Sequence, residues 1–279
     1  MKKLLALVFA LVMLFSVTAI AEPITLQIGF ENSMSEPIGQ ALTKWQELVA
    51  EKGDGSIVIE LFPDSQLGNK TDLIDQMLLG EPVMTLADGA FFADYGVPDM
   101  GIVFGPFLFE NWEQCWTLIE SDWWNEQCAK LEDLGIKMVA ANWAYGARHT
   151  LTTKQVKTPA DLAGLQIRVP TNQIQTKGFE YLGATPVGMS LGDVYTALQQ
   201  GTIDGGENPL STLYGRKHHE VAKYLCLDGH VLNFTNWVCS DMWFDSLTPE
   251  QQELLLTTGK EAGIYNNQLQ AEADEYYMN

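Results

Sequence analysis

The chain has 279 residues and carries 36 acidic against 16 basic side chains, which gives a formal net charge of −20 at pH 7. Such a charge repels nucleic acids and anionic membrane surfaces, so neither is an expected partner. The same charge opposes an anionic ligand at long range, so the donors that hold one must act locally and away from water.

The N-terminus has the pattern of a secretory signal peptide. Two lysines precede an apolar run from Leu4 to Phe15, and the small residues that follow predict cleavage near Ala21. Removal of residues 1–21 takes away two lysines and no acids, so the charge changes from −20 to −22. No later stretch is comparably apolar and no cysteine stands at the junction for a lipid anchor. We therefore expect a protein of a Gram-negative-type periplasm that is not embedded in the membrane.

The first part of the mature chain alternates strand and helix patterns, which is typical of a parallel sheet. Ser35 is placed to cap the first helix and Gly53 to end it. Asp88 stands at the C-terminal end of the third strand. The expected elements are strands at 24–30, 56–63 and 83–87 and helices at 37–52 and 71–79.

Longer elements follow in the second part. The segment 111–134 has a helical period and admits a break near Asp122. A buried strand at 137–143 runs into a glycine-containing loop at 144–149, and Thr248 opens a long helix with a capping-box pattern. Further strands are expected at 165–169 and within 201–209, and a helix at 192–200. The chain is long enough for two lobes and has no flexible linker, so we expect strands or helices to connect the lobes as hinges.

Arginine occurs only three times, and the position of Arg168 is the most informative. It lies in the strand 165–169 on the face opposite the apolar side chains, and Pro170 ends that strand. Ligands of open α/β sheets bind at the C-terminal ends of strands, and a guanidinium fork suits a carboxylate. Arg148 is expected at the same topological position, in the loop that leaves its strand. The alternative is a solvated arginine on a surface strand.

Other motifs give no positive sign of an enzyme. Nucleotide-binding, hydrolase and metalloprotease signatures are absent from the sequence. Trp143 and Tyr145 flank Arg148 and are expected to wall a ligand pocket. His230, at the start of a strand, is expected to be neutral and to bond either a ligand or a backbone carbonyl.

The histidines and cysteines do not form a metal-binding pattern. His218 and His219 are adjacent on an expected helix, so their rings point apart, and we interpret them as part of a solvated basic patch. The four cysteines lack C-x-x-C spacing, and free buried thiols are favoured although their even number permits disulfides. We expect no metal and no cofactor.

Three ordered segments carry a family resemblance: 146–148, 158–170 and 194–209, which read GAR, TPADLAGLQIRVP and VYTALQQGTIDGGENP. Together with FPDSQLG at 62–68, they closely resemble the DctP-type solute-binding proteins of tripartite ATP-independent periplasmic (TRAP) transporters. The likeness covers nearly the whole mature chain. It implies an α/β fold of the type II periplasmic-binding-protein class, with two α/β lobes, crossing strands and a long C-terminal helix.

The resemblance also implies boundaries for the lobes. Residues 22–145 would form lobe I, completed by about 234–273, and residues 146–233 would form lobe II. Family members continue past the long helix with another strand and helix, whereas this sequence stops at Asn279. We therefore expect lobe II to lack its C-terminal completion and an extended chain to be more stable.

In the family, the arginine that matches Arg168 forms the main salt bridge to the ligand carboxylate. Leu191 stands where sialic-acid binders have an aromatic residue, and Thr171 replaces an asparagine of such binders, so sialic acid is not the expected ligand. The resemblance implies a ligand-binding set of Arg168, Arg148, Asn208, Asp88, His230 and Leu191. Trp143 is added to this set because it flanks Arg148.

The implied function is that of a periplasmic receptor without catalytic activity. It would capture a small organic acid, such as a dicarboxylate, keto acid or sugar acid, and deliver it to the membrane permease of a TRAP transporter. The alternative from another class is a secreted carbohydrate-active enzyme with an aromatic cleft.

Overall fold

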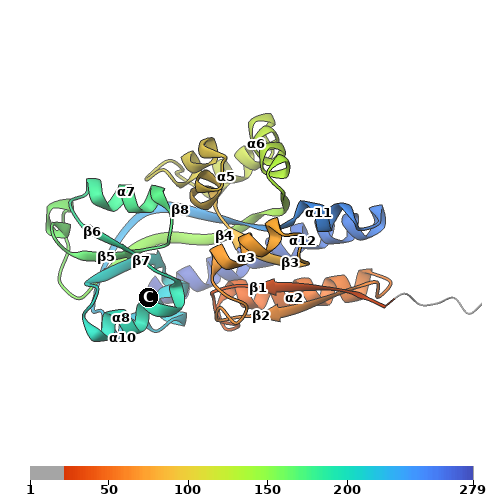
Figure 1. Cartoon of the computed structure of the whole chain (residues 1–279). Coiled ribbons are helices and arrows are strands. Elements are labelled where there is room, and N and C mark those ends of the chain that lie inside the picture. The colour runs from red at the N-terminus through yellow and green to blue at the C-terminus, as the bar shows by residue number, and fades with distance from the viewer. Residues whose placement is uncertain (1–21, 279) are drawn as a thin grey trace, which may run out of the picture.

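Two strands of 17 residues each, β4 (Ile136–Thr152) and β8 (Tyr224–Ser240), run antiparallel through the middle of one eight-stranded sheet (Figure 1). The computed structural model describes residues 22–278, so the predicted signal peptide and its cleavage site lie outside the described residues. The strand order is β2-β1-β3-β8-β4-β7-β5-β6. Each end of the sheet thus belongs to a different part of the chain, and the two long strands cross between them, as the resemblance implies.

The first end of the sheet is parallel, as predicted. β1 lies between β2 and β3 and is parallel to both. The prediction that Ser35 caps α2 is wrong, because Glu36 occupies the N-cap and the Ser35 hydroxyl is paired with that of Ser33 at 2.9 Å. The bounds are β1 (Ile24–Gly29), α2 (Pro37–Lys52), β2 (Ile57–Phe62), α3 (Lys70–Leu78), β3 (Val83–Ala87) and α4 (Gly89–Asp94).

Two helices occupy the segment that the sequence admits as one. The 3-10 helix η1 (Pro98–Phe104) leads to α5 (Trp112–Ile119) and α6 (Asp122–Asp133), which lie together on one side of the sheet (Figure 1). The break falls at Ser121, whose hydroxyl accepts a hydrogen bond from the backbone N–H of Trp124 at 3.2 Å. A serine N-cap of this kind starts a new helix.

The second end of the sheet is also parallel, with β5 between β6 and β7. The strand predicted within 201–209 is confirmed for its last five residues. The bounds are η2 (Pro159–Leu162), β5 (Gln166–Val169), α7 (Gln173–Tyr181), β6 (Thr185–Gly188), η3 (Leu191–Asp193), α8 (Val194–Gln200), β7 (Gly205–Pro209), α9 (Leu210–Gly215) and α10 (His218–Val221).

The loop predicted at 144–149 does not exist, because β4 continues through it. Pairing with β8 accommodates the irregular stretch by several register shifts, and Gly146 adopts a φ of +128°. A Cβ at Gly146 would lie 2.6 Å from Cβ of Pro209 in β7, so the glycine permits close pairing as well as the backbone angle. Arg148 therefore lies within a central strand, and the prediction that it shares the topological position of Arg168 is wrong.

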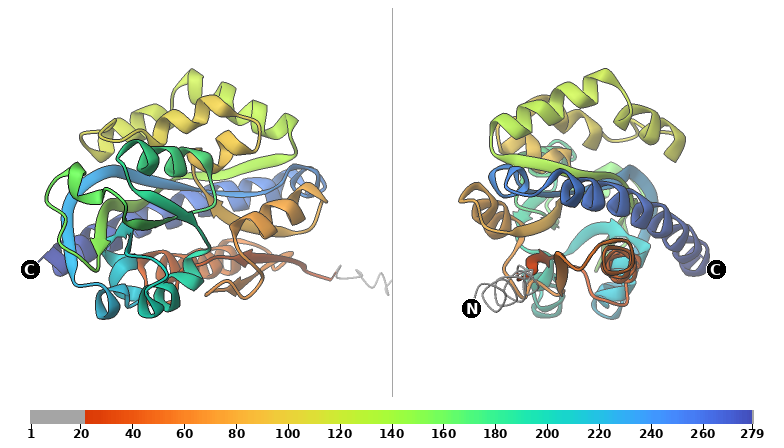
Figure 2. Two further views of the ribbon diagram at one scale, coloured as in Figure 1. Left: turned by 60° about the vertical axis from the view of Figure 1, so that its left-hand side comes forward. Right: turned by 90° about the vertical axis from the view of Figure 1, so that its right-hand side faces the viewer.

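The long C-terminal helix α12 (Pro249–Met278) follows the short α11 (Asp241–Asp245) and extends along both halves of the molecule (Figure 2). Its predicted capping box is confirmed, because the backbone N–H groups of Thr248 and Gln251 each donate to the side chain of the other. Near its start, Trp45 of α2 donates to Thr258 at 3.0 Å, and near its end Gln270 lies 3.2 Å from Ser211 of α9. None of the helices among residues 22–278 is both long and apolar enough to cross a membrane.

Three tryptophans form the centre of the largest core. Trp45, Trp143 and Trp237 are each 0% exposed, with ring centroids 5.3 to 6.1 Å apart. The indole N–H of Trp143 donates to the carbonyl of Gly259 in α12 at 3.0 Å. The prediction that Trp143 walls a ligand pocket is therefore wrong, because its face of β4 is covered by α12.

The four cysteines are free, as the sequence favoured. Cys115 and Cys239 are buried, whereas Cys128 and Cys226 are half-buried. Burial raises the pKa of the Cys115 and Cys128 thiols to about 12, so both are protonated and unreactive near neutral pH.

Two helical glycines should respond in opposite ways to alanine. A Cβ on Gly259 would lie 2.6 Å from the Trp45 ring, whereas a Cβ on Gly178 of α7 meets no atom within 4 Å. We expect Gly259→Ala to lower the free energy of unfolding by about 1–3 kcal/mol through overpacking. Gly178→Ala, the matched control, should raise it by about 0.5–1 kcal/mol because it restricts the unfolded chain. Urea denaturation measures both, and equal effects would contradict this account of α12 packing.

Candidate ligand-binding site

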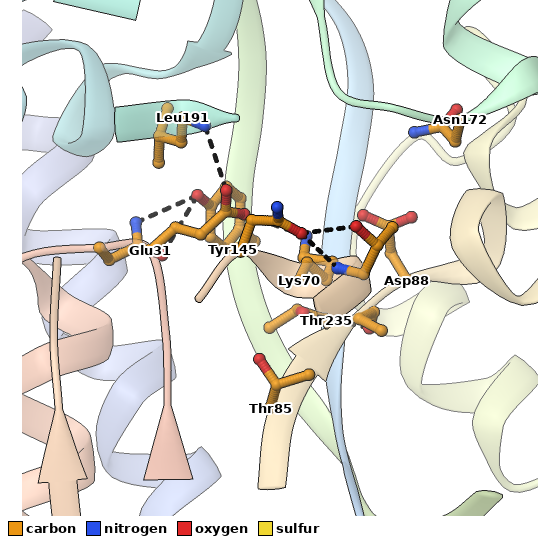
Figure 3. A network of polar contacts seen from close by, with 12 residues as sticks. Glu31, Lys70, Thr85, Asp88, Tyr145, Asn172, Leu191 and Thr235 are labelled. Atoms are coloured by element: carbon orange, nitrogen blue, oxygen red, sulfur yellow. Dashed lines mark hydrogen bonds and ion pairs between the residues drawn. The ribbon is translucent and has the colours of Figure 1, made fainter. Parts of the chain in front are cut away.

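A cavity lies between the two halves of the molecule. Its empty space of about 340 Å³ includes open solvent, and the part that admits the centre of a water molecule is only about 20 Å³, so a ligand would require the two halves to part. Both ends of the sheet and both crossing strands contribute to its wall (Figure 3). The lining residues are Glu31, Lys70, Leu86, Asp88, Tyr145, Arg148, Arg168, Pro170, Leu191, Asn208, Asn233 and Thr235.

The C-terminal ends of parallel strands bring several of these side chains to the cavity. Glu31 comes two residues after β1, Asp88 directly follows β3, and Arg168 is the last residue but one of β5. Side chains at these ends converge because parallel neighbours finish at the same edge. The rule that the sequence analysis applied to Arg168 therefore holds at both ends of the sheet.

Arg168 is a buried cation without a counterion. It is 3% exposed, and among residues 22–278 no carboxylate lies within the 4.0 Å of an ion pair. Its Nε and Nη2 donate to the carbonyl of Met189 at 3.0 and 2.7 Å. A guanidinium has five N–H donors, so three remain unused. Burial lowers the pKa of Arg168 below its ordinary value, and Glu31 and Glu207 oppose that shift at longer range. An anion in the cavity would relieve this unfavourable burial.

Arg148 also lines the cavity, but its charge is already neutralised. Its guanidinium forms a bidentate ion pair with Glu207, in which Nε bonds one carboxylate oxygen and Nη2 the other at 2.7 Å. Nη2 also lies 3.1 Å from Oδ1 of Asn208, and Nη1 donates to Oδ1 of Asn233 at 2.9 Å. Burial alone would lower the pKa of Arg148, but the charge and hydrogen bonds of Glu207 raise it. Arg148 thus positions its neighbours, and most of its donors are not available to a ligand.

His230 lies behind this ion pair and outside the cavity lining. Its Nε2 is 3.3 Å from Glu207 and its Nδ1 is 3.3 Å from Asp228. Burial favours the neutral ring, but the two carboxylates outweigh it and raise the pKa of His230 to about 9. The prediction of a neutral imidazole is therefore wrong. Burial would raise the pKa of Glu207, yet Arg148 and His230 lower it to about 2.

Lys70 and Glu31 belong to the cavity although the sequence analysis did not select them. The Lys70 ammonium lies 3.9 Å from Glu31 Oε2 and 4.3 Å from the centre of the Phe91 ring. Figure 3 shows Glu31, Lys70 and Asp88 close together. The position of Glu31 just after the first strand could have identified it as a site residue. Lys70 has no such signal, because it follows the helix cap Asn69 and reaches the cavity through tertiary packing.

The remaining predicted residues divide between the cavity and the interior. Asn208 and Leu191 line the cavity, as Asp88 does. His218 is 2% exposed, and burial together with the charges of Arg168 and Arg216 lowers its pKa to about 3. The interpretation of His218 as part of a solvated basic patch is therefore wrong.

Several polar contacts join the two halves around the cavity. The backbone N–H of Leu191 donates to Oε1 of Glu31 at 3.1 Å (Figure 3). The backbone N–H of Gln173 donates to Asp94 at 2.9 Å, and Arg216 forms an ion pair with Asp64. Each contact joins an element of the first half to one of the second, so their separation would open the cavity.

The sequence matches a known family over most of its length. Residues 28–279 fit the sequence model of the DctP family, described as bacterial extracellular solute-binding protein, family 7. The 2,3-diketo-L-gulonate-binding periplasmic protein YiaO of Escherichia coli is 34% identical over 259 residues, which are 92% of this chain and 78% of YiaO.

Solved structures of TRAP periplasmic solute-binding proteins share the fold. The protein from Ochrobacterium anthropi, with L-fuconate bound, has a TM-score of 0.89 and 38% identity, covering 92% of this chain and 85% of that one. The protein from Actinobacillus succinogenes, with L-galactonate bound, has a TM-score of 0.88 and 36% identity, covering 91% and 84%.

The pairing of His230 predicts a stability that depends on pH. The pKa of about 9 in the folded state exceeds the ordinary 6.5, so the contribution of the protonated ring is complete below pH 6.5 and is lost as the pH rises through 9. Between pH 6.5 and about 9.5 we expect the free energy of unfolding to fall by about 3 kcal/mol more in the wild type than in His230→Gln. Urea denaturation at both pH values provides the test, and parallel declines would show that His230 does not carry this charge.

Proposed function

The chain belongs to the DctP family, family 7 of the bacterial extracellular solute-binding proteins, and we propose that it is the periplasmic receptor of a TRAP transporter for a small carboxylic acid rich in hydroxyl groups. After removal of the predicted signal peptide it would bind this acid in the cavity and deliver it to the membrane permease. The receptors with L-fuconate and L-galactonate bound, at 38% and 36% identity, support a sugar acid as ligand.

The observation that carries the proposal is the buried, unpaired guanidinium of Arg168. Its three unused N–H donors can form a bidentate pair with a carboxylate, which is the strongest hydrogen-bonding arrangement available to arginine. In this pair the ligand carboxylate compensates the buried positive charge of Arg168. In a chain with a net charge of −20, this local donor would overcome an unfavourable long-range field.

The rest of the lining suits hydroxyl groups. Asn208, Asn233 and Thr235 offer amide and hydroxyl groups near the arginines, and Tyr145 offers the only aromatic ring among the lining residues. Hydroxyls can donate to and accept from such groups in turn. The aromatic cleft of the alternative, a secreted carbohydrate-active enzyme, therefore receives no support from this cavity.

Closure about the crossing strands would complete the site. The irregular pairing of β4 with β8 lies between the two ends of the sheet, where bending would change their relative orientation. We propose that the moving halves are lobe I, 22–145 with about 234–273, and lobe II, 146–233. Closure would bring Leu191 to Glu31 and exclude water from Arg168, which strengthens its pair with the ligand.

Removal of the Arg168 charge should abolish high-affinity binding. For an acid bound with micromolar affinity, about −8 kcal/mol, we expect Arg168→Met to weaken binding at least about 100-fold, because a buried carboxylate loses its partner. Lys44→Met, on the exposed face of α2, should bind as the wild type does. Calorimetric titration with a panel that includes L-fuconate and L-galactonate gives the affinities, and unchanged binding by Arg168→Met would refute the proposal.

The two cavity arginines should differ in their effect on the unliganded fold. Arg148→Met leaves Glu207 buried with only His230 as a cationic partner, so we expect a loss of about 3–5 kcal/mol in the free energy of unfolding. Arg168→Met removes an unpaired charge and should change stability by less than about 1 kcal/mol. Urea denaturation without ligand measures both losses. A larger loss for Arg168→Met than for Arg148→Met would mean that Arg168, and not Arg148, is the arginine held in an ion pair.

A further inference from the structure

We propose that Asp88 limits the ligand to one negative charge, so that the cavity accepts hydroxylated monocarboxylates and rejects acids with a second anionic group. The inference rests on the function proposed above and specifies the ligand class of the same cavity. It concerns a part of the wall that none of the three arginines occupies.

The charges around the cavity are balanced before a ligand enters, and His230 behind it is offset by Asp228 at 3.3 Å. Three cations face three carboxylates, and two of the cations have carboxylate neighbours of their own. Arg148 is paired with Glu207, and Lys70 lies 3.9 Å from Glu31. The six charged residues are Arg148, Arg168, Lys70, Glu31, Asp88 and Glu207.

One cation and one carboxylate remain without an ion pair. Among residues 22–278, neither Arg168 nor Asp88 has an oppositely charged group within 4.0 Å. A single ligand carboxylate at Arg168 therefore uses the one free positive charge. A second anionic group would meet no free cation, and beside Asp88, which is 6% exposed, it would be repelled.

The position of Asp88 is rigid. It is the N-cap of α4, where Oδ1 accepts a hydrogen bond from the backbone N–H of Ala90 at 3.1 Å, and it is 6% exposed. A carboxylate offers about four acceptor positions and no donor, so most of its capacity stays free for other donors. Burial raises the pKa of Asp88, and the charges of Lys70 and Arg148 oppose this shift without cancelling it.

Hydroxyl groups and anionic groups are thus treated differently. A ligand hydroxyl can donate to Asp88, whereas an ionised carboxylate can only accept and would place two like charges together. Lys70 does not compensate, because its ammonium is already shared between Glu31 and the ring of Phe91. Asp88 is therefore the residue whose charge decides between one and two anionic groups on the ligand.

Asp88→Asn isolates this charge from the structural role of the side chain. Asparagine has nearly the same size and is an equally good N-cap, so the bond from Ala90 is kept. Asp88→Ser is a second uncharged variant that also caps a helix. Asp99→Asn is the matched control, because Asp99 lies on η1 with a side chain that is 63% exposed.

The experiment compares sugar acids that differ only in a second carboxylate. Calorimetry would measure galactonate against galactarate, gluconate against glucarate and mannonate against mannarate. We expect the wild type to bind at least one monoacid about 100-fold more tightly than its diacid. In Asp88→Asn and Asp88→Ser this ratio should fall at least about 10-fold through tighter binding of the diacid, while Asp99→Asn keeps the wild-type ratio.

The outcomes separate this inference from the function on which it rests. If the wild type binds a diacid as tightly as its monoacid, or if both Asp88 variants keep the wild-type ratio, the charge limit is overturned while the receptor function stands. If none of the six acids binds, the proposed ligand class fails and the charge limit fails with it. Melting curves of each variant show whether it is folded, and a variant that fails to fold leaves the other to decide.

Discussion

The site depends on one unfavourable arrangement, the burial of the Arg168 guanidinium without a counterion. A buried charge is tolerated only when hydrogen bonds or a partner compensate it, and the carbonyl of Met189 satisfies two of its five donors. The remaining donors face a cavity in which the only other arginine is already neutralised by Glu207. In the proposed function, selectivity for an anion would arise because Arg168 is the one cation of the cavity wall without an ion pair.

The surrounding structure keeps that cation in place. His230, Glu207 and Arg148 form a buried chain of alternating charges behind the cavity, and each member holds the next in its ionised form. Such a fully paired network is rigid, because breaking any link leaves a charge uncompensated. The crossing strands β4 and β8 carry Arg148 and His230, and β7 carries Glu207. The helix α12 covers the tryptophan core on β4 and β8. The scaffold is therefore stiff at the site, and polar contacts such as those of Leu191 with Glu31 and of Arg216 with Asp64 join the two halves beside it.

Local sequence patterns predicted most of the elements because each pattern has a local cause. The apolar stripe of α2, the alternation in β5 and the capping box of α12 are all confirmed. The errors have non-local causes. The stretch 144–149 contains a glycine and appeared to be a loop, yet pairing with β8 and β7 keeps it extended. Trp143 lies close to Arg148 in sequence, but its indole packs against Trp45 and Trp237 and donates to Gly259 of α12, which buries it.

The sequence by itself determined the class of fold, the strand that carries Arg168 and the family resemblance, which implies that this residue pairs with the ligand carboxylate. These follow from periodicity, turn residues and ordered motifs, which are properties of neighbouring positions. Only the tertiary structure decided which arginine is free and which is neutralised, because Glu207 and Arg148 are 59 residues apart and meet through the pairing of β4 with β7. It likewise brought Lys70, Glu31 and Asp88 to one cavity. Charge balance depends on distances between residues remote in sequence, and no local pattern contains them.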